Sequence, residues 1–308
     1  MTTLIEPPTR ESLAGIQSLE LEITGKCQLT CTHCLSESSP QATHGTMTPE
    51  DWRTVIIDAA ALSVRTIQLI GGEPTVHPNW QEFAELALSL GMRVEVFSNL
   101  FHVRDEWWDM FARDGVTLGT SYYSNDPVEH DKITGRKNSY VRTRTNIREA
   151  ITRGITVRAG IVEVLPGQHV AEARAELESM GVKQIIVDRA RAVGRAMLPG
   201  QGSNLDEMCG RCTRGRAAIL PNGDLAGCVL ARDFPVGNVR ETRLAELFGG
   251  KEWASLAASI PMPARNACPP GRLQRLQPGE QRSVRPRLRL KGLATWIGRK
   301  GRAGSPTR

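Results

Sequence analysis

Three cysteines near the N-terminus form the most reactive group in this sequence. Cys27, Cys31 and Cys34 are spaced C-x3-C-x2-C and directly follow an alternating run over residues 19–23. A closed structural zinc site uses four protein ligands, and a four-iron cluster normally takes four cysteines. Three thiolates on one loop therefore predict a metal centre with one open corner, where an exchangeable ligand can react.

A second candidate group comes directly after the predicted strand 66–70. Its residues are Gly71-Gly72-Glu73-Pro74. Paired glycines let a ligand approach the backbone closely, and the carboxylate of Glu73 can accept hydrogen bonds from an ammonium group. An ordinary tight turn is the alternative. Its position on the strand after the three-cysteine loop favours a ligand-binding turn.

A second group of cysteines lies in the C-terminal third of the chain. Cys209 and Cys212 are spaced C-x2-C, and Cys228 and Cys268 follow. The turn Pro221-Asn222-Gly223-Asp224 predicts a β-hairpin that returns Cys228 beside the first two. A zinc ribbon also uses four cysteines, so a zinc site and an iron–sulfur site are both open at this point.

The elements that must position these groups alternate between strand and helix. This alternation with short connections predicts an α/β fold in which a parallel sheet is covered by helices. Six such units are too few for a closed eight-fold barrel, so we expect an open six-unit (β/α)6 partial TIM barrel. Ligands collect at the C-terminal strand ends of such sheets. The predicted strands cover residues 18–24, 66–70, 92–97, 116–121, 155–164 and 183–188, and the helices 48–62, 79–90, 104–113, 138–153 and 170–180.

The three-cysteine loop, the Gly-Gly-Glu-Pro turn and the six units together resemble the radical S-adenosylmethionine (SAM) enzymes. The resemblance implies that Cys27, Cys31 and Cys34 bind a [4Fe-4S] cluster whose fourth iron is chelated by SAM. It also implies reductive cleavage of SAM to a 5′-deoxyadenosyl radical, which abstracts a hydrogen atom from a substrate. His33, a further candidate for cofactor binding, stands where the family usually has an aromatic residue.

The resemblance implies further SAM contacts at the strand ends. The turn Gly71-Gly72-Glu73 matches the family's motif for the SAM amino group. Ser98 and Asn99 stand where the family often has Thr-Asn-Gly, with Leu100 in place of the glycine. Ser121 matches the position that usually contacts the ribose. A capped strand end or a polar loop is the alternative for each.

Residues near the ends of the later strands complete the predicted site. Glu163 lies where the family often has a polar residue near the ribose or methionine of SAM. Arg189 and Arg195 could reach the SAM carboxylate or the substrate, and a solvated basic stretch is the alternative. Tyr122 and Tyr123 could form a wall of the substrate pocket, although packing is the more common role of such aromatic residues.

The second cysteine group resembles the SPASM/Twitch auxiliary-cluster domain of radical SAM enzymes. The spacing C-x10-G-x4-C from Cys212 to Cys228 carries this resemblance. A full SPASM domain has seven cysteines for two clusters, so the resemblance implies one auxiliary [4Fe-4S] cluster on Cys209, Cys212, Cys228 and Cys268. These two sets use all 7 cysteines and leave no thiol to return a hydrogen atom unless Cys268 is free. This favours net oxidation over epimerisation.

Composition divides the chain into four predicted parts. These are an N-terminal extension (1–17), a radical SAM partial barrel (18–195), a SPASM/Twitch-like domain containing the hairpin (196–271) and a basic tail (272–308). The tail holds 11 of the 39 Lys and Arg residues but one of the 33 acids, so residues 1–271 are mildly acidic. We expect the tail to be disordered. Its abrupt onset after Cys268 is typical of a truncated or frameshifted relative.

The predicted function is oxidative modification of a ribosomally made peptide. The alternatives are a radical SAM dehydrogenase or epimerase of a sugar or aminocyclitol, and a zinc-bound scaffold whose basic tail binds nucleic acid. The acidic body argues against nucleic acid. Expected partners are a flavodoxin- or ferredoxin-type electron donor, a precursor peptide or small molecule, and, for a peptide, a separate leader-peptide-binding protein. No apolar run approaches the roughly 20 residues of a membrane span, so a cytoplasmic location is expected.

Overall fold

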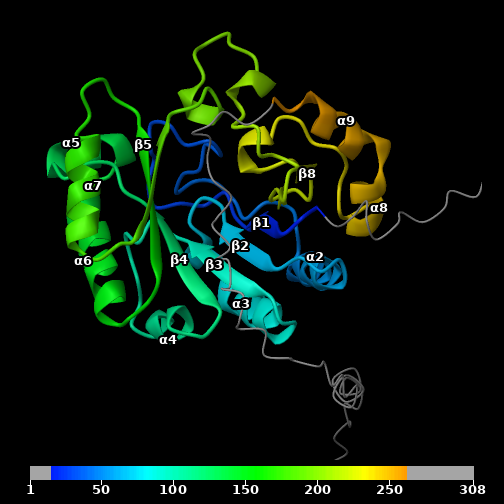
Figure 1. The fold of residues 1–308 in the computed structure, drawn as a ribbon, viewed down its shortest axis with the longest axis horizontal. Helices are drawn as coiled ribbons and strands as arrows, with labels where there is room; N and C mark the ends of the chain where they lie inside the picture. The colour runs from blue at the N-terminus through cyan, green and yellow to red at the C-terminus, as the bar shows by residue number, and fades with distance from the viewer. Residues whose placement is uncertain (1–14, 262–308) are drawn as a thin grey trace, which may run out of the picture. The chain divides into compact units, whose positions relative to one another are not determined.

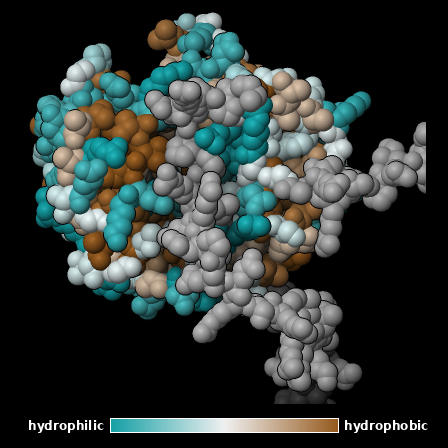
Figure 2. Space-filling model, in the orientation of Figure 1, coloured by the Kyte–Doolittle hydropathy of each residue, from teal (hydrophilic) through white to brown (hydrophobic). Residues whose placement is uncertain are grey.

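The computed structural model describes residues 15–261. Most of the predicted N-terminal extension lies outside the described residues, as do Cys268 and the whole predicted tail. No described helix is long and apolar enough to cross a membrane. Figure 2 shows hydrophilic side chains over much of one face, with a group of apolar side chains beside α7, the helix over Val170–Ser179.

Eight described strands form one sheet in the order β6-β5-β4-β3-β2-β1-β7-β8. The first six run parallel to their neighbours, which confirms the predicted α/β fold and its order. The predicted hairpin is also present, but β7 pairs parallel with β1, so the hairpin extends the same sheet. The strands are β1 Ser18–Glu22, β2 Thr66–Ile70, β3 Arg93–Phe97, β4 Val116–Ser121, β5 Val157–Glu163, β6 Gln184–Arg189, β7 Arg216–Ile219 and β8 Leu225–Ala226.

The helices α2 to α7 connect the parallel strands, and α8 and α9 lie near the hairpin (Figure 1). The side chain of Thr48 accepts the Asp51 N–H and Asp51 accepts the Thr48 N–H, a capping box that fixes the start of α2. The helix α5 was not predicted, although Asp126 caps it and Pro127 begins it. The helices are α2 Pro49–Ala61, α3 Trp80–Ser89, α4 Trp107–Phe111, α5 Pro127–Thr134, α6 Ser139–Thr152, α7 Val170–Ser179, α8 Leu244–Gly249 and α9 Lys251–Ser259.

The two faces of β1 have opposite chemistry. Leu19 and Leu21 are fully buried in the main hydrophobic core. The alternate residues Glu20 and Glu22 are also buried, but they line a cavity on the inner face of the sheet. Burying a carboxylate requires partners, and the Arg216 guanidinium donates to Glu20 at 3.3 Å. The inner face of β1 is therefore polar.

Candidate functional site

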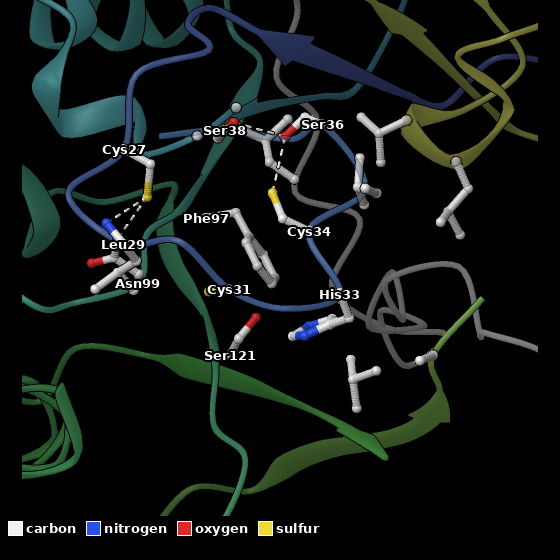
Figure 3. A pocket seen from close by; sticks show the side chains of 18 of the residues that line it. Cys27, Leu29, Cys31, His33, Cys34, Ser36, Ser38, Phe97, Asn99 and Ser121 are labelled. Atoms are coloured by element: carbon white, nitrogen blue, oxygen red, sulfur yellow. Dashed lines mark hydrogen bonds between the residues drawn. The ribbon is translucent and has the colours of Figure 1, made fainter. Parts of the chain in front are cut away.

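One cavity of about 320 Å³ joins the groups that the sequence placed far apart. It lies at the C-terminal ends of the parallel strands, where such sheets bind ligands. Figure 3 shows Phe97 in the middle of the cavity, with the three cysteines of the loop, Asn99 and Ser121 arranged around it. The cavity also reaches Val229, next to Cys228. Lining residues from the predicted site are Cys27, Cys31, His33, Cys34, Gly71, Gly72, Asn99, Ser121, Tyr123, Arg189 and Arg195.

Each of the three cysteines has a hydrogen-bond donor close to its sulfur. The Leu29 N–H donates to Cys27 Sγ at 3.4 Å, and Asn99 Nδ2 lies 3.5 Å from the same sulfur. Ser36 Oγ lies 3.5 Å from Cys34 Sγ, and the Tyr123 hydroxyl hydrogen-bonds Cys31. Hydrogen bonds to the sulfurs are one of the ways in which proteins stabilise and tune iron–sulfur clusters.

Burial also affects the ionisation of two of these thiols. Burial raises the pKa of Cys31 to about 12 and raises that of Cys27 further. Buried thiols of this kind lose their protons when a metal supplies the compensating charge.

No three His, Cys, Asp or Glu side chains among the described residues surround a single ion position. A cubane cluster does not need this, because each cysteine ligates a different iron. The donor set therefore fits a [4Fe-4S] cluster.

The three-cysteine loop is clamped by the segment that follows β6. Arg195 Nε donates to the Cys31 carbonyl at 2.8 Å, and Arg195 Nη2 donates to the Ser38 carbonyl at 2.8 Å. The Arg195 N–H also donates to the Cys34 carbonyl at 3.0 Å. Arg195 was predicted to reach SAM or substrate; it lines the cavity, and its guanidinium binds the backbone on both sides of Cys34.

We expect Arg195→Ala to loosen this loop. The change removes the guanidinium donor from the Ser38 carbonyl, whereas the Cys31 carbonyl keeps the Cys34 N–H at 3.2 Å. Losing the donor to a buried carbonyl costs about 1–3 kcal/mol. The measurement is the rate at which a chelator removes iron from the reconstituted protein, together with the melting temperature. The control is Arg174→Ala, which removes a surface ion pair with Glu178 and is expected to change stability by about 0.5 kcal/mol or less. Equal iron loss in both variants would contradict the clamp.

The Gly-Gly turn is packed tightly against the chain that leads into Cys27. The Gly72 N–H donates to the Thr24 carbonyl at 2.7 Å, and the Glu73 N–H donates to the Lys26 carbonyl at 2.8 Å. A Cβ atom on Gly71 would lie 2.4 Å from the Thr24 oxygen, and one on Gly72 would lie 2.2 Å from the Lys26 oxygen. The absence of side chains thus permits a close approach between two chain segments as well as an approach by a ligand.

Glu73 and Ser98 connect the second and third strand ends beneath the cavity. Glu73 is fully buried, accepting from the Thr75 hydroxyl at 2.7 Å and from the Asn99 N–H at 2.7 Å. Burial raises its pKa, and these hydrogen bonds oppose the shift. The buried Ser98 hydroxyl accepts the Leu100 N–H. Leu100 has a φ of 51°, a left-handed conformation that a glycine adopts more easily. Neither Glu73 nor Ser98 lines the cavity.

The remaining predicted residues separate into two groups. His33 and Ser121 point toward the same space in Figure 3, and burial lowers the pKa of His33 to about 4. Arg189 lines the cavity but forms an ion pair with Glu207 at 2.8 Å. Glu163 does not reach the cavity, because strand side chains alternate and its neighbour Val162 takes the inward position.

The two tyrosines after β4 have different surroundings. Tyr123 lines the cavity, and its ring meets that of His33 edge to face with centroids 5.0 Å apart. Tyr122 is fully buried and donates to Glu176 at 2.5 Å, on the side of α7. The structure thus places Tyr123 in the cavity wall, as the sequence suggested, and Tyr122 in packing.

The second cysteine group is brought together by the hairpin. Cys212 Sγ lies 2.7 Å from Cys228 Sγ, and Cys209 also hydrogen-bonds Cys212. Both neighbouring thiols raise the pKa of Cys212 well above its usual range. Arg214 donates to the carbonyls of Gly210 and Pro261. The last described residue is therefore held beside this group, seven residues before Cys268.

The comparisons with known proteins agree with this geometry. A family model described as the radical SAM superfamily matches residues 21–179, slightly more than half of the chain. The chain belongs to the radical SAM superfamily. A second model, SPASM, an iron–sulfur cluster-binding domain, matches residues 206–269. The chain therefore combines a radical SAM region with a SPASM region, and these matches argue against the zinc-bound scaffold.

Relatives with this architecture include peptide-maturing proteins. The antilisterial bacteriocin subtilosin biosynthesis protein AlbA of Bacillus subtilis is 32% identical over 142 residues, covering 46% of this chain and 32% of AlbA. The sporulation killing factor maturation protein SkfB of the same species is 28% identical over 181 residues, covering 58% and 44%. The chain thus spans between about a third and a half of these relatives. SuiB of Streptococcus suis bound to SAM shares the fold, with a TM-score of 0.66 at 15% identity over 79% of this chain and 68% of SuiB.

Proposed function

We propose that this chain cleaves SAM reductively and uses the resulting radical to oxidise a ribosomally made peptide. The observation that carries the proposal is the single cavity that contacts the three-cysteine loop, the Gly-Gly turn and the hairpin segment after Cys228. A substrate held there lies between both cysteine groups. AlbA is named for the biosynthesis of the bacteriocin subtilosin and SkfB for the maturation of the sporulation killing factor, and SuiB has been solved with its precursor peptide SuiA.

In this proposal the chain's own residues hold the two cofactors. Cys27, Cys31 and Cys34 hold the [4Fe-4S] cluster, and the bound cluster and SAM supply a one-electron reductant and a radical source. The backbone of Gly71 and Gly72 receives the amino group of SAM. Glu73 and Ser98 fix the turn beneath it. Asn99, Ser121, His33 and Arg189 complete the SAM site.

We further propose one auxiliary [4Fe-4S] cluster on Cys209, Cys212, Cys228 and Cys268. The first three are gathered by the hairpin. Cys268 lies seven residues beyond Pro261, and an extended chain of that length spans up to about 25 Å. The proposed partial barrel (18–195) and SPASM/Twitch-like region (196–271) share one sheet through β1 and β7. A flavodoxin or ferredoxin supplies electrons, and a separate leader-peptide-binding protein presents the peptide.

The test is anaerobic reconstitution followed by co-expression with short peptides encoded next to the gene. We expect about eight iron atoms per chain, formation of 5′-deoxyadenosine on reduction, and a peptide that loses two hydrogen atoms. The choice of substrate would be overturned if the peptide kept its mass and 5′-deoxyadenosine formed only when a small molecule was added and modified. A similar protein, the SAM-dependent nucleotide dehydratase of a Thermoplasmatales archaeon, is 27% identical over 156 residues and is named for such a substrate.

A further inference from the structure

Glu22 is a buried carboxylate with one unused oxygen. It ends β1, is 1% exposed and forms part of the cavity wall. Oε2 accepts a hydrogen bond from Arg232 Nη1 at 2.8 Å, whereas Oε1 has no hydrogen-bond partner. Buried oxygens are almost always paired, because leaving one unpaired loses the hydrogen bonds it makes in water. A donor group on a bound molecule would supply the missing partner.

The position of Glu22 suits a substrate. It pairs in register with Ile70, one residue before the Gly-Gly turn. Its other oxygen is held by Arg232, four residues after Cys228. The carboxylate therefore stands on the wall between the three-cysteine loop and the hairpin that carries the second cysteine group. A molecule that contacts it lies next to the SAM site.

Charges around Glu22 favour a neutral donor. Each acid that lines the cavity is paired with an arginine. The pairs are Glu20 with Arg216, Asp188 with Arg191, and Glu22 with Arg232. An added cation would leave one charge uncompensated in a buried space, which is costly. The wall of the same cavity also includes the apolar Ile70, Phe97, Val162 and Leu230. The matching group is an apolar side chain that ends in an O–H or N–H.

We propose that Glu22 is a specificity-determining residue, whose free oxygen selects a substrate side chain that is apolar and carries a neutral hydrogen-bond donor. The inference rests on the proposed radical SAM function, since it places the substrate in the same cavity. A phenol, an indole or an aliphatic alcohol has this chemistry. The selection acts through binding and does not require Glu22 to take part in hydrogen abstraction.

The test uses two probes, p-cresol and 4-methylanisole, in which a methyl ether in the second replaces the O–H donor of the first. Their dissociation constants are measured by anaerobic equilibrium dialysis against the reconstituted, SAM-loaded enzyme. A hydrogen bond to a charged group is worth about 1.5–3 kcal/mol, so we expect p-cresol to bind about tenfold tighter or more. In Glu22→Gln the Arg232 guanidinium retains the amide oxygen, and an NH2 donor replaces the free acceptor. This variant is expected to lose the preference or reverse it.

Glu20→Gln is the matched control. Glu20 lies on the same strand and the same wall, but both of its oxygens are engaged, one by Arg216 and one by the Val229 N–H at 2.9 Å. This variant is expected to retain the preference for p-cresol. Equal affinity for the two probes in the wild type, an unchanged preference in Glu22→Gln, or an equal change in both variants would each overturn the inference. A tenfold loss of SAM affinity in Glu22→Gln with an unchanged probe preference would assign the oxygen to SAM and also overturn it.

A separate measurement distinguishes this inference from the proposed function. Formation of 5′-deoxyadenosine by the dithionite-reduced wild-type enzyme, without any probe, tests SAM cleavage alone. Failure of that reaction removes the proposed function, whatever the probes do. Normal SAM cleavage with no preference between the probes removes only the assignment of Glu22.

Discussion

Replacing Cys31 by alanine is expected to abolish SAM cleavage, whereas replacing Cys212 by alanine is expected to leave it in place. Cys31 lines the cavity with the Gly-Gly turn, and Cys212 lies in a separate buried cluster with Cys228. Each change removes a thiolate that the proposal assigns to a different iron–sulfur cluster. Iron should fall from about eight to about four atoms per chain in either variant. The measurement is 5′-deoxyadenosine formed per chain after reduction, which should drop to background only in Cys31→Ala.

The same pair of variants tests the division of labour between the clusters. With a peptide substrate, Cys212→Ala should still consume SAM but yield little oxidised product. Cys228→Ala serves as a second variant of the same site, since its sulfur lies 2.7 Å from that of Cys212. SAM cleavage at the wild-type rate in Cys31→Ala would mean that the three-cysteine loop does not hold the reactive cluster. Loss of SAM cleavage in both hairpin variants would mean that the second group is not auxiliary.

The sequence predicted the parallel part of the fold because its local signals agree with its tertiary structure. Helices close with glycines or begin with caps, and the strands between them are short and apolar. The helix α5 was not predicted, although Asp126-Pro127 is the same type of signal as the Thr48-Pro49 at the start of α2. The partner of β7 could not be predicted, because hairpin chemistry determines only the β7–β8 pairing and says nothing about β1.

Part of the candidate site could also be predicted, because local motifs mark it in the sequence. The spacing of the motifs predicted that the cysteines and the Gly-Gly turn lie at the strand ends, and the cavity contacts them there. Glu163 was misplaced, because one residue of register decides which way a strand side chain faces. Glu20 and Glu22 were overlooked as functional residues. Their alternation with Leu19 and Leu21 resembles a half-solvated strand, but a strand inside a parallel sheet is covered on both faces, so such acids are interior.

Replacing Gly72 by alanine is expected to disrupt the SAM site by steric conflict alone. Its Cβ would lie 2.2 Å from the Lys26 carbonyl oxygen, and that oxygen is already held by the Glu73 N–H. Because the obstacle is backbone rather than a flexible side chain, the turn and the loop before Cys27 must separate. Overpacking of this kind costs about 1–3 kcal/mol, and occasionally more. We expect a lower melting temperature and a SAM affinity at least about tenfold weaker, measured by equilibrium dialysis.

Gly202→Ala provides the control for a glycine that has no such neighbour. No atom lies within 4 Å of a Cβ at Gly202. A methyl group there reduces the freedom of the unfolded chain, so stability should stay the same or rise by up to about 1 kcal/mol. SAM affinity should not change. If Gly72→Ala had the same melting temperature and SAM affinity as Gly202→Ala, the turn would be able to move away from Lys26. The Gly-Gly turn would then not be the fixed wall of the cofactor site.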